Sequence, residues 1–187
     1  MDKHYLAPLF SPESIVVFAG QADDPASQTS HARRLHEALH AQRFSGTLQF
    51  LDIRTSGTLA DLAQARADLA IIALPPQDVA AALELAGRVA CRSALVISNG
   101  IGAERAAELK KIARREGICL LGPNGLGFQR PQLQLNASAI GPLAKAGSLA
   151  LVSQSGALTS SMLDWARNNA VGFSAVVSLG PNTAVDI

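Results

Sequence analysis

Short apolar runs alternate along this chain with longer segments in which apolar residues recur every three or four positions. The run Ile15–Ala19 ends at Gly20, and Leu35 and Leu39 then lie four residues apart in a polar background. A short apolar run that stops at glycine is typical of a buried strand, whereas a spacing of four indicates one face of a helix. The alternation predicts strands at 14–20, 48–52, 68–74, 93–98 and 118–121, and helices at 30–42, 77–89 and 104–116.

The order of these elements predicts the fold class. Strands that alternate with helices are the signature of an α/β protein with a doubly wound parallel sheet. Because the crossovers are right-handed, the carboxyl ends of the strands meet at one edge of the sheet, and open α/β sheets bind ligands there. The residues expected at that edge are 20–21, 52–54, 75–76, 98–100 and 122–124.

A second region follows an irregular stretch. Residues 128–147 are rich in Pro, Gln, Asn, Gly and Ala and show neither helical nor strand periodicity, and a strand, a helix and a strand are then expected at 148–152, 157–168 and 173–179. One β-α-β unit buries its sheet poorly, so we expect further protein to cover it. The domains expected are a first domain at 1–130, a linker at 131–146, and the N-terminal part of a truncated second α/β domain at 147–187.

Composition and charge narrow the function classes. Apolar residues make up 48% of the chain and aromatic residues only 4%, which suits helices packed on buried parallel strands. The net charge is +1 with acidic and basic residues interspersed, so we expect no nucleic acid partner. The sequence has no run of about 18 apolar residues and no apolar leader, so we expect a cytoplasmic protein without a membrane partner.

The two cysteines give no sign of a metal site. Cys91 and Cys119 are far apart and lie outside any CxxC or Cys/His pattern that would bind zinc. Both flank apolar runs, so we expect buried, reduced thiols and no bound metal.

The loop after the first predicted strand lies where a nucleotide-binding sheet keeps its glycine-rich phosphate turn. Gly20 is the only glycine there, and Asp23 and Asp24 bring negative charge to the place of the phosphates. A GxGxxG dinucleotide site is therefore absent. The loop is open to a second interpretation, a surface loop in which residues 27–30 cap the next helix.

Two later turns carry more specific patterns. The segment 122–127, Gly-Pro-Asn-Gly-Leu-Gly, follows a strand and indicates a rigid turn with exposed backbone amides. The segment 153–156, Ser-Gln-Ser-Gly, joins a strand to a helix and fits a cradle for a phosphate or an oxyanion. Serines that only cap the helix are the alternative. A nucleophile elbow is disfavoured, because the first glycine of GxSxG is lacking and no histidine follows Ser153.

Six groups of residues occur here in the order found in one enzyme family. They are Pro8–Val17, Leu120–Gly127, Leu135–Ala137, Val152–Ala157, Leu163–Ala166, and Gly172–Ser174 together with Ser178–Gly180. On these motifs, which span essentially the whole chain, the sequence resembles the NDP-forming (ADP-forming) acyl-CoA synthetases. The same order is found in the synthetase-like region of bacterial protein lysine acetyltransferases that carry a GNAT domain. Succinyl-CoA synthetase α subunits are similar at a greater distance.

The resemblance implies a CoA-binding Rossmann-like domain followed by the start of a flavodoxin-like ligase domain. The cofactor-binding residues that it implies are Gly20 and Gln21 near the CoA phosphates, Arg54 near the ribose or adenine, Pro75, Ser98, Asn99 and Gly100 along the pantetheine arm, and Pro123 and Asn124 near the thiol. It also implies that the phosphate of a phosphohistidine intermediate is bound by Ser153, Gln154, Ser155 and Gly156. No catalytic residue is implied, since the histidine that carries this phosphate has no counterpart here.

This sequence departs from the family pattern in several loops. The first loop has Asp23 and Asp24 where the family is richer in glycine, and Pro181 and Ala184 replace an Asn and an Asp. We therefore expect no tight binding of CoA or acyl-CoA, and no synthetase activity from this chain alone. The partners implied are the remaining ligase and ATP-grasp domains or subunit, and a homo-oligomer is a further option. Two other functions stay open, an acyl-CoA-sensing regulatory region of a GNAT-type acetyltransferase and an interaction scaffold without a ligand.

Overall fold

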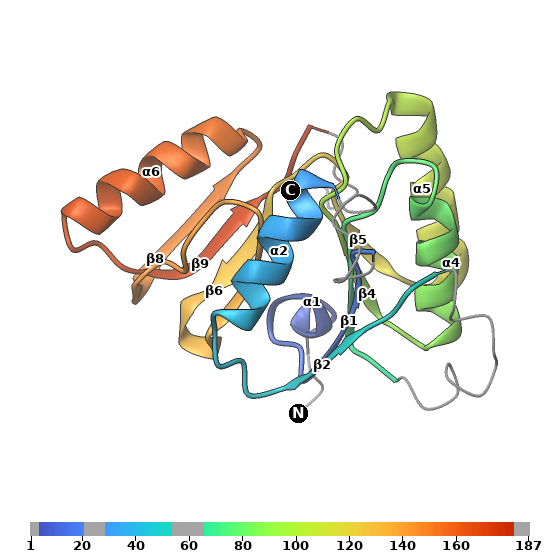
Figure 1. Ribbon diagram of the computed structural model, residues 1–187, viewed down its shortest axis with the longest axis horizontal. Coiled ribbons are helices and arrows are strands. Elements are labelled where there is room, and N and C mark those ends of the chain that lie inside the picture. The colour runs from blue at the N-terminus through green and yellow to red at the C-terminus, as the bar shows by residue number, and fades with distance from the viewer. Residues whose placement is uncertain (1–3, 21–28, 54–65, 182–187) are drawn as a thin grey trace.

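The computed structural model describes residues 4–20, 29–53 and 66–181, and within them the chain forms two sheets (Figure 1). Helix α2 (Ser30–His40) lies between the two sheets, α4 (Val79–Arg88) and α5 (Ala103–Glu116) cover the far face of the first sheet, and α6 (Gly156–Asn168) packs on the second. Among the described residues, no helix has the length and apolar character needed to span a membrane.

The first sheet, called sheet A, is parallel throughout and has the order β2-β1-β3-β4-β5. Its strands are β1 (Ser14–Phe18), β2 (Thr47–Phe50), β3 (Leu69–Ile72), β4 (Ser93–Val96) and β5 (Cys119–Leu121). All five strands and the three helices predicted for this region are present, with ends that differ by a few residues. The doubly wound α/β fold class is therefore confirmed.

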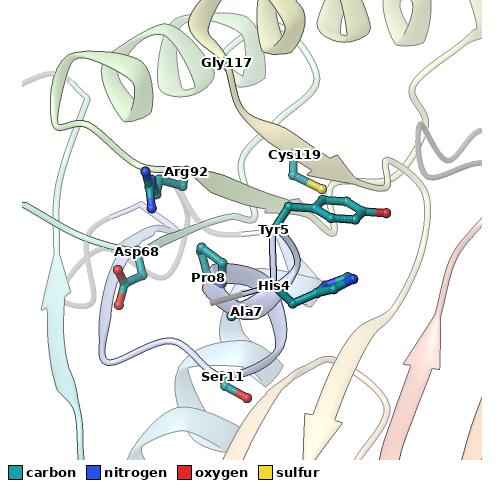
Figure 2. A pocket seen from close by; sticks show the side chains of 9 residues that line it. All are labelled: His4, Tyr5, Ala7, Pro8, Ser11, Asp68, Arg92, Gly117 and Cys119. Atoms are coloured by element: carbon teal, nitrogen blue, oxygen red, sulfur yellow. The ribbon is translucent and has the colours of Figure 1, made fainter. Parts of the chain in front are cut away.

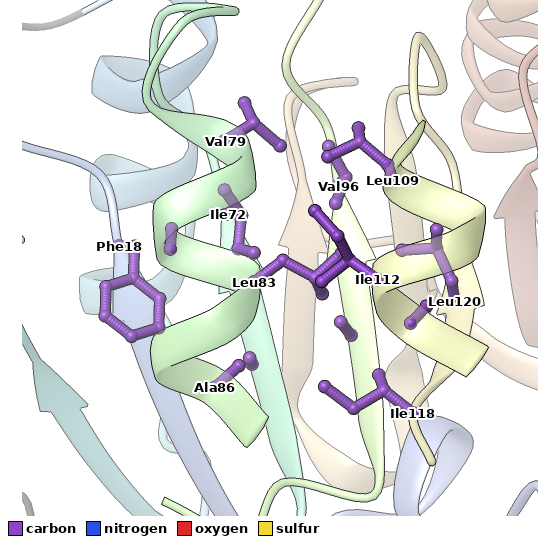
Figure 3. Packing of buried hydrophobic residues seen from close by; sticks show 14 of the residues in the cluster. Phe18, Ile72, Val79, Leu83, Ala86, Val96, Leu109, Ile112, Ile118 and Leu120 are labelled. Carbon is purple, nitrogen blue, oxygen red and sulfur yellow. The ribbon is translucent and has the colours of Figure 1, made fainter. Parts of the chain in front are cut away.

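Alternate strand residues of sheet A point to opposite sides, so the sheet contributes side chains to two cores, one on each face. Val16 and Phe18 of β1 belong to the core beneath α4 and α5, whereas Ile15 and Val17 belong to the core beneath α2. Figure 3 shows the first of these cores, where side chains of α4 and α5 meet over the strands. Strands buried on both faces read as continuous apolar runs, which is the pattern that the sequence displays here.

The second sheet, called sheet B, has the order β7-β6-β9-β8 and is mixed. Its elements are β6 (Gly127–Arg130), a 3-10 helix η1 (Pro131–Leu133), β7 (Leu135–Ser138), β8 (Ala146–Ser153) and β9 (Phe173–Ser178). Strand β6 runs antiparallel to β7 and β9, while β8 and β9 are parallel and are joined through α6. The strand-helix-strand pattern predicted after residue 147 is confirmed.

The prediction that residues 128–147 lack regular structure is wrong, since β6, η1 and β7 lie there. The pattern was hidden because polar side chains are buried in these strands. Gln129 is fully buried, with its Oε1 accepting from the Ala144 N–H at 2.9 Å and its Nε2 donating to Ser138 Oγ at 3.3 Å. Asn136 is also buried and donates from Nδ2 to the Gly141 carbonyl at 2.8 Å. Hydrogen bonds satisfy both amides, so burial does not follow hydrophobicity here.

Sheet B packs on the α2 side of sheet A rather than standing apart. Phe128, Leu135 and Val177 of sheet B belong to the same buried cluster as Leu35 of α2. A polar link adds to this core: Arg130 donates from Nε to the Ser174 carbonyl at 3.1 Å and from Nη1 to the Phe10 carbonyl at the end of α1 (Ala7–Phe10). The domain boundaries given above stay a prediction, although strand pairing shows that the chain enters sheet B at Gly127.

Candidate functional site

The carboxyl edge of sheet A gathers most of the residues predicted to bind a cofactor. Strand β1 leads to Gly20, β3 to Pro75, and β4 to Ser98, Asn99 and Gly100, while Pro123 and Asn124 follow β5. This placement follows from the parallel order of the strands. Gln21 and Arg54, which were also predicted to bind the cofactor, lie outside the described residues.

The loops after β4 and β5 are tied together by one amide side chain. Asn124 Nδ2 donates to the Ile101 carbonyl at 2.8 Å, and its Oδ1 accepts from the Ile101 N–H at 3.1 Å. The Asn124 N–H in turn donates to the Ser98 carbonyl at 3.1 Å. Asn124 has φ +63, a left-handed conformation that asparagine tolerates better than most residues. The two loops therefore form a single rigid wall at this edge.

Two glycines show how closely this wall is packed at one point and how open it is at another. A Cβ added at Gly122, where φ is +97, would lie 2.1 Å from the Val96 carbonyl oxygen, so only glycine fits. A Cβ at Gly100, where φ is +74, would meet nothing within 4 Å. The base of the wall is thus fixed against β4, while its rim at Gly100 leaves room for a ligand to approach the backbone.

The turn after β5 also contacts the end of β9 in sheet B. The Leu126 N–H donates to Ser178 Oγ at 3.1 Å, and a Cβ at Gly125 would lie 2.4 Å from the Ser178 carbonyl oxygen. The Leu179 N–H then donates to the Ser153 carbonyl at 2.9 Å. Through the end of β9, the predicted thiol-binding turn and the predicted phosphate-binding turn are held as neighbours.

The turn predicted to bind phosphate is the N-terminus of α6. Ser155 is the N-cap, and its Oγ accepts from the Leu158 N–H at 3.2 Å, so the capping role considered from the sequence is confirmed for this serine. Ser153 Oγ accepts from the Ser155 N–H at 3.0 Å and shapes the turn. The N–H groups of Gly156 and Ala157 have no acceptor within the helix by their position, and the helix dipole places partial positive charge beside them. Gln154 lies exposed between the two serines.

Gly156 brings this helix end against the other turn. A Cβ at Gly156 would lie 2.6 Å from Leu126 Cδ1, so the helix N-terminus packs directly on the residue that follows the predicted thiol-binding segment. An anion held at the helix end would therefore lie close to a ligand bound along the wall. This juxtaposition is the property of the site that no single motif in the sequence reveals.

His31 lies at the same edge and was not among the predicted site residues. Its Nδ1 is 3.0 Å from the Ile97 carbonyl, directly after β4. Thr29, the N-cap of α2, accepts from the Ala32 N–H at 3.1 Å and donates from Oγ1 to the Ala73 carbonyl at 3.3 Å. The start of α2 is thus bonded to the ends of β3 and β4. Sequence spacing gave no signal for His31, because 66 residues separate it from its partner.

The opposite, amino edge of sheet A carries a separate cavity of about 540 Å³ (Figure 2). It is lined by His4, Tyr5, Ala7, Pro8, Ser11, Asp68, Arg92, Gly117 and Cys119. Asp68 Oδ2 accepts from the Glu13 N–H at 2.8 Å and the Ser14 N–H at 3.3 Å, which gives this carboxylate a structural role at the start of β1. Because ligands of open α/β sheets bind outside the carboxyl ends, the fold does not point to this cavity as the main site.

Neither cysteine is activated for chemistry. Burial raises the pKa of Cys91 to about 12, with the charge of Asp68 adding to the effect, and burial also raises the pKa of Cys119. Cys91 is fully buried as expected, whereas Cys119 is only half-buried. In the part of the chain that the structure describes, no three or more His, Cys, Asp and Glu side chains are grouped to hold a metal ion.

Comparison with sequences of known function gives consistent relatives. A sequence profile described as the succinyl-CoA ligase-like flavodoxin domain matches residues 146–187. The chain is similar to ADP-forming acetate–CoA ligase I of Archaeoglobus fulgidus, with 41% identity over 125 residues that make up 64% of this chain and 18% of that protein. It is also similar to the α subunit of the ADP-forming acetate–CoA ligase I of Pyrococcus furiosus, with 38% identity over 64% of this chain and 27% of that subunit.

Comparison with solved structures gives relatives of the same kind as the sequence comparison. The fold matches the apo form of a dinucleotide-forming acetyl-CoA synthetase 1 from Ca. Korarchaeum cryptofilum with a TM-score of 0.84 and 26% identity, over 97% of this chain and 41% of that chain. The present chain thus spans well under half the length of the relatives that it matches.

Proposed function

We propose that this chain, which is similar to NDP-forming acyl-CoA synthetases, supplies the part of such a synthetase that binds coenzyme A or acyl-CoA. The observation that carries the proposal is the contact between two turns from different sheets. The turn at 122–126 and the helix end at 153–156 both contact the end of β9, and Gly156 packs on Leu126. A thioester-forming ligase needs these two kinds of site, one for a thiol and one for a phosphate, side by side.

Two features of the described residues support a CoA molecule at this edge. Gly100 leaves open space at the rim of the wall, and the buried Ser98 Oγ has no hydrogen-bond partner among the described residues. A buried hydroxyl without a partner is costly, and a ligand amide passing along the end of β4 would satisfy it. We therefore assign Pro75, Ser98, Asn99 and Gly100 to the pantetheine arm and Pro123 and Asn124 to the thiol end, where CoA supplies its nucleophilic sulfur.

The N-terminus of α6 would stabilise negative charge beside that thiol. Its free N–H groups and the positive end of the helix dipole suit a phosphoryl group, and electrostatic stabilisation of this kind lowers reaction barriers when the donors are already in place. All four histidines of the chain lie within its first forty residues, so none follows the helix of the second sheet. We propose that the histidine that carries the phosphate comes from the remaining ligase and ATP-grasp parts, in the same protein or in a partner subunit.

The relatives reported above are named as CoA ligases, and none supports the acetyltransferase-linked alternative. A sensing role for acyl-CoA would use the same wall, so it is a variant of the proposed binding function. The scaffold alternative differs in requiring no ligand, and the acidic first loop with Asp23 and Asp24 is the feature that favours it.

Calorimetric titration of the purified chain with CoA and acetyl-CoA tests the proposal, with NAD as the negative control. We expect micromolar CoA binding and no response to NAD. Absence of binding at millimolar CoA would refute the proposed site and favour the scaffold. A second assay supplies acetate, ATP and CoA to the chain alone; we expect no acetyl-CoA, and steady formation of it would contradict the assignment of the histidine to a partner.

A further inference from the structure

His31 is the residue at the carboxyl edge whose role the assigned site does not yet explain. It lies in the first turn of α2, on the side of sheet A that also receives sheet B. Its Nδ1 contacts the Ile97 carbonyl at 3.0 Å, which means that the imidazole reaches from α2, over the sheet, to the end of β4. Ile97 directly follows β4, and the next residue is Ser98, whose buried Oγ has no partner among the described residues.

The hydrogen bond to Ile97 fixes the role of one ring nitrogen of His31. A backbone carbonyl can only accept, so Nδ1 of His31 carries the proton and donates. The described residues provide no hydrogen-bond partner for Nε2, which can accept whenever the ring is neutral. The His31 residue as a whole is only partly buried.

When the ring is neutral, Nε2 can pair only with a hydrogen-bond donor of CoA. A phosphate oxygen also accepts, so it gains nothing from Nε2 of a neutral imidazole. The pantetheine arm has two secondary amides, and each has an N–H that can donate. We propose that His31 is a ligand-binding residue of the CoA site, whose Nε2 accepts a hydrogen bond from a pantetheine amide while Ser98 Oγ pairs with a polar atom of the same arm. This inference rests on the proposed function and goes beyond it by adding His31.

Two isosteric substitutions separate ligand binding from a purely structural role. In His31→Asn, the side-chain amide NH2 can take the place of Nδ1–H and keep the bond to Ile97, while the position of Nε2 is left empty. In His31→Gln, the amide reaches the position of Nε2 but gives up the bond to Ile97. His36→Asn, on the partly exposed side of the same helix, serves as the matched control.

Calorimetric titration with CoA and with adenosine 3′,5′-bisphosphate, which lacks the pantetheine arm, measures whether His31 binds that arm. We expect His31→Asn to weaken CoA binding about tenfold, the size of one lost hydrogen bond, and to leave the bisphosphate affinity unchanged. His31→Gln should retain CoA affinity within about threefold but lower the melting temperature by about 2–4 °C through loss of the Ile97 bond. His36→Asn should bind both ligands like the wild type.

Three results would overturn the proposal in distinguishable ways. If His31→Asn binds CoA like the wild type, His31 only anchors α2 to β4. If both ligands weaken equally in His31→Asn, the side chain affects the nucleotide end or the whole site rather than the arm. If the unaltered chain does not bind CoA, the proposed function itself fails, and the role of His31 fails with it.

Discussion

Sheet A and sheet B differ in how completely the chain covers them. The strands β1, β3 and β4 of sheet A are buried along almost their whole length, with helices on both faces. Strand β8 at the edge of sheet B alternates between exposed and half-buried residues, and Leu149 and Val152 are 54% and 53% exposed. Sheet A is therefore buried on both faces, on one side together with residues of sheet B, whereas sheet B leaves apolar surface open.

The exposed surface continues onto α6. Leu158, Met162 and Trp165 lie at a spacing of four and three residues, on one face of the helix, and are 53%, 37% and 54% exposed. An apolar stripe beside a sheet edge is typical of a surface that further protein covers. The two loops after β4 and β5 are thus held by contacts within the described residues, whereas the predicted phosphate-binding turn belongs to a region with an exposed apolar surface.

The largest effect is expected where sheet A is packed most tightly. Gly122→Ala would force a Cβ to within 2.1 Å of the Val96 carbonyl oxygen at φ +97, so the loop after β5 must move. We expect the free energy of unfolding to fall by about 3 kcal/mol or more, measured by urea denaturation. Gly102→Ala is the control, because a Cβ there meets nothing within 4 Å, and it should cost no more than about 1 kcal/mol through the weaker N-cap that alanine gives α5. Equal effects of both substitutions would contradict the close packing described for this wall.

A smaller loss is expected where the two sheets are joined. Arg130→Met removes the bonds from the guanidinium to the Ser174 and Phe10 carbonyls but keeps an unbranched side chain of similar length. Hydrogen bonds from a charged donor are worth about 1.5–3 kcal/mol, so we expect a loss of about 2 kcal/mol in urea denaturation.

Arg167→Met gives the matched comparison for Arg130. Arg167 is exposed and pairs with Asp164 at 2.8 Å within α6, so its loss should cost less than about 1 kcal/mol. If Arg130→Met proves equally mild, the link between the sheets does not stabilise their arrangement.

The smallest effect on stability is expected on the open surface of sheet B. Replacing Leu158 and Trp165 together by Gln should leave the free energy of unfolding within about 0.5 kcal/mol, because both side chains are already exposed. It should lower self-association of the purified chain at high concentration, measured by analytical ultracentrifugation. The same double substitution with Leu163 and Ala166, which are buried, should unfold the second region. Unchanged self-association of the Leu158/Trp165 variant would show that this surface does not mediate it.

The sequence predicted sheet A well for a physical reason. Its strands are buried on both faces and its helices carry apolar residues at helical spacing, so burial and hydrophobicity coincide. Strands β6 and β7 escaped prediction because Gln129 and Asn136 are buried with satisfied amides. In these strands, hydrogen bonds to other residues allow polar side chains to be buried. The hydrophobic pattern along the sequence does not reveal these partners.

The site was predictable in its parts but not in its assembly. The turns at 122–127 and 153–156 stand out in the sequence by their glycines and serines. Their meeting depends on the end of β9, where Ser178 binds Leu126 and Leu179 binds the Ser153 carbonyl. The hydrogen bond between His31 and the Ile97 carbonyl likewise depends on how α2 packs on the sheet. Contacts of this kind follow from the tertiary fold, so no spacing along the chain could reveal them.

The proposed CoA site lies at the carboxyl edge of sheet A, where the two sheets meet. The most direct test is a titration of the ¹⁵N-labelled chain with CoA, followed by the shifts of assigned backbone amides in NMR spectra. We predict shifts at Gly100, Ile101 and Gly125, extending to Gly156, and none at Tyr5 or Gly117 beside the cavity at the amino edge. Shifts confined to the amino-edge cavity, with the carboxyl edge unchanged, would contradict the account.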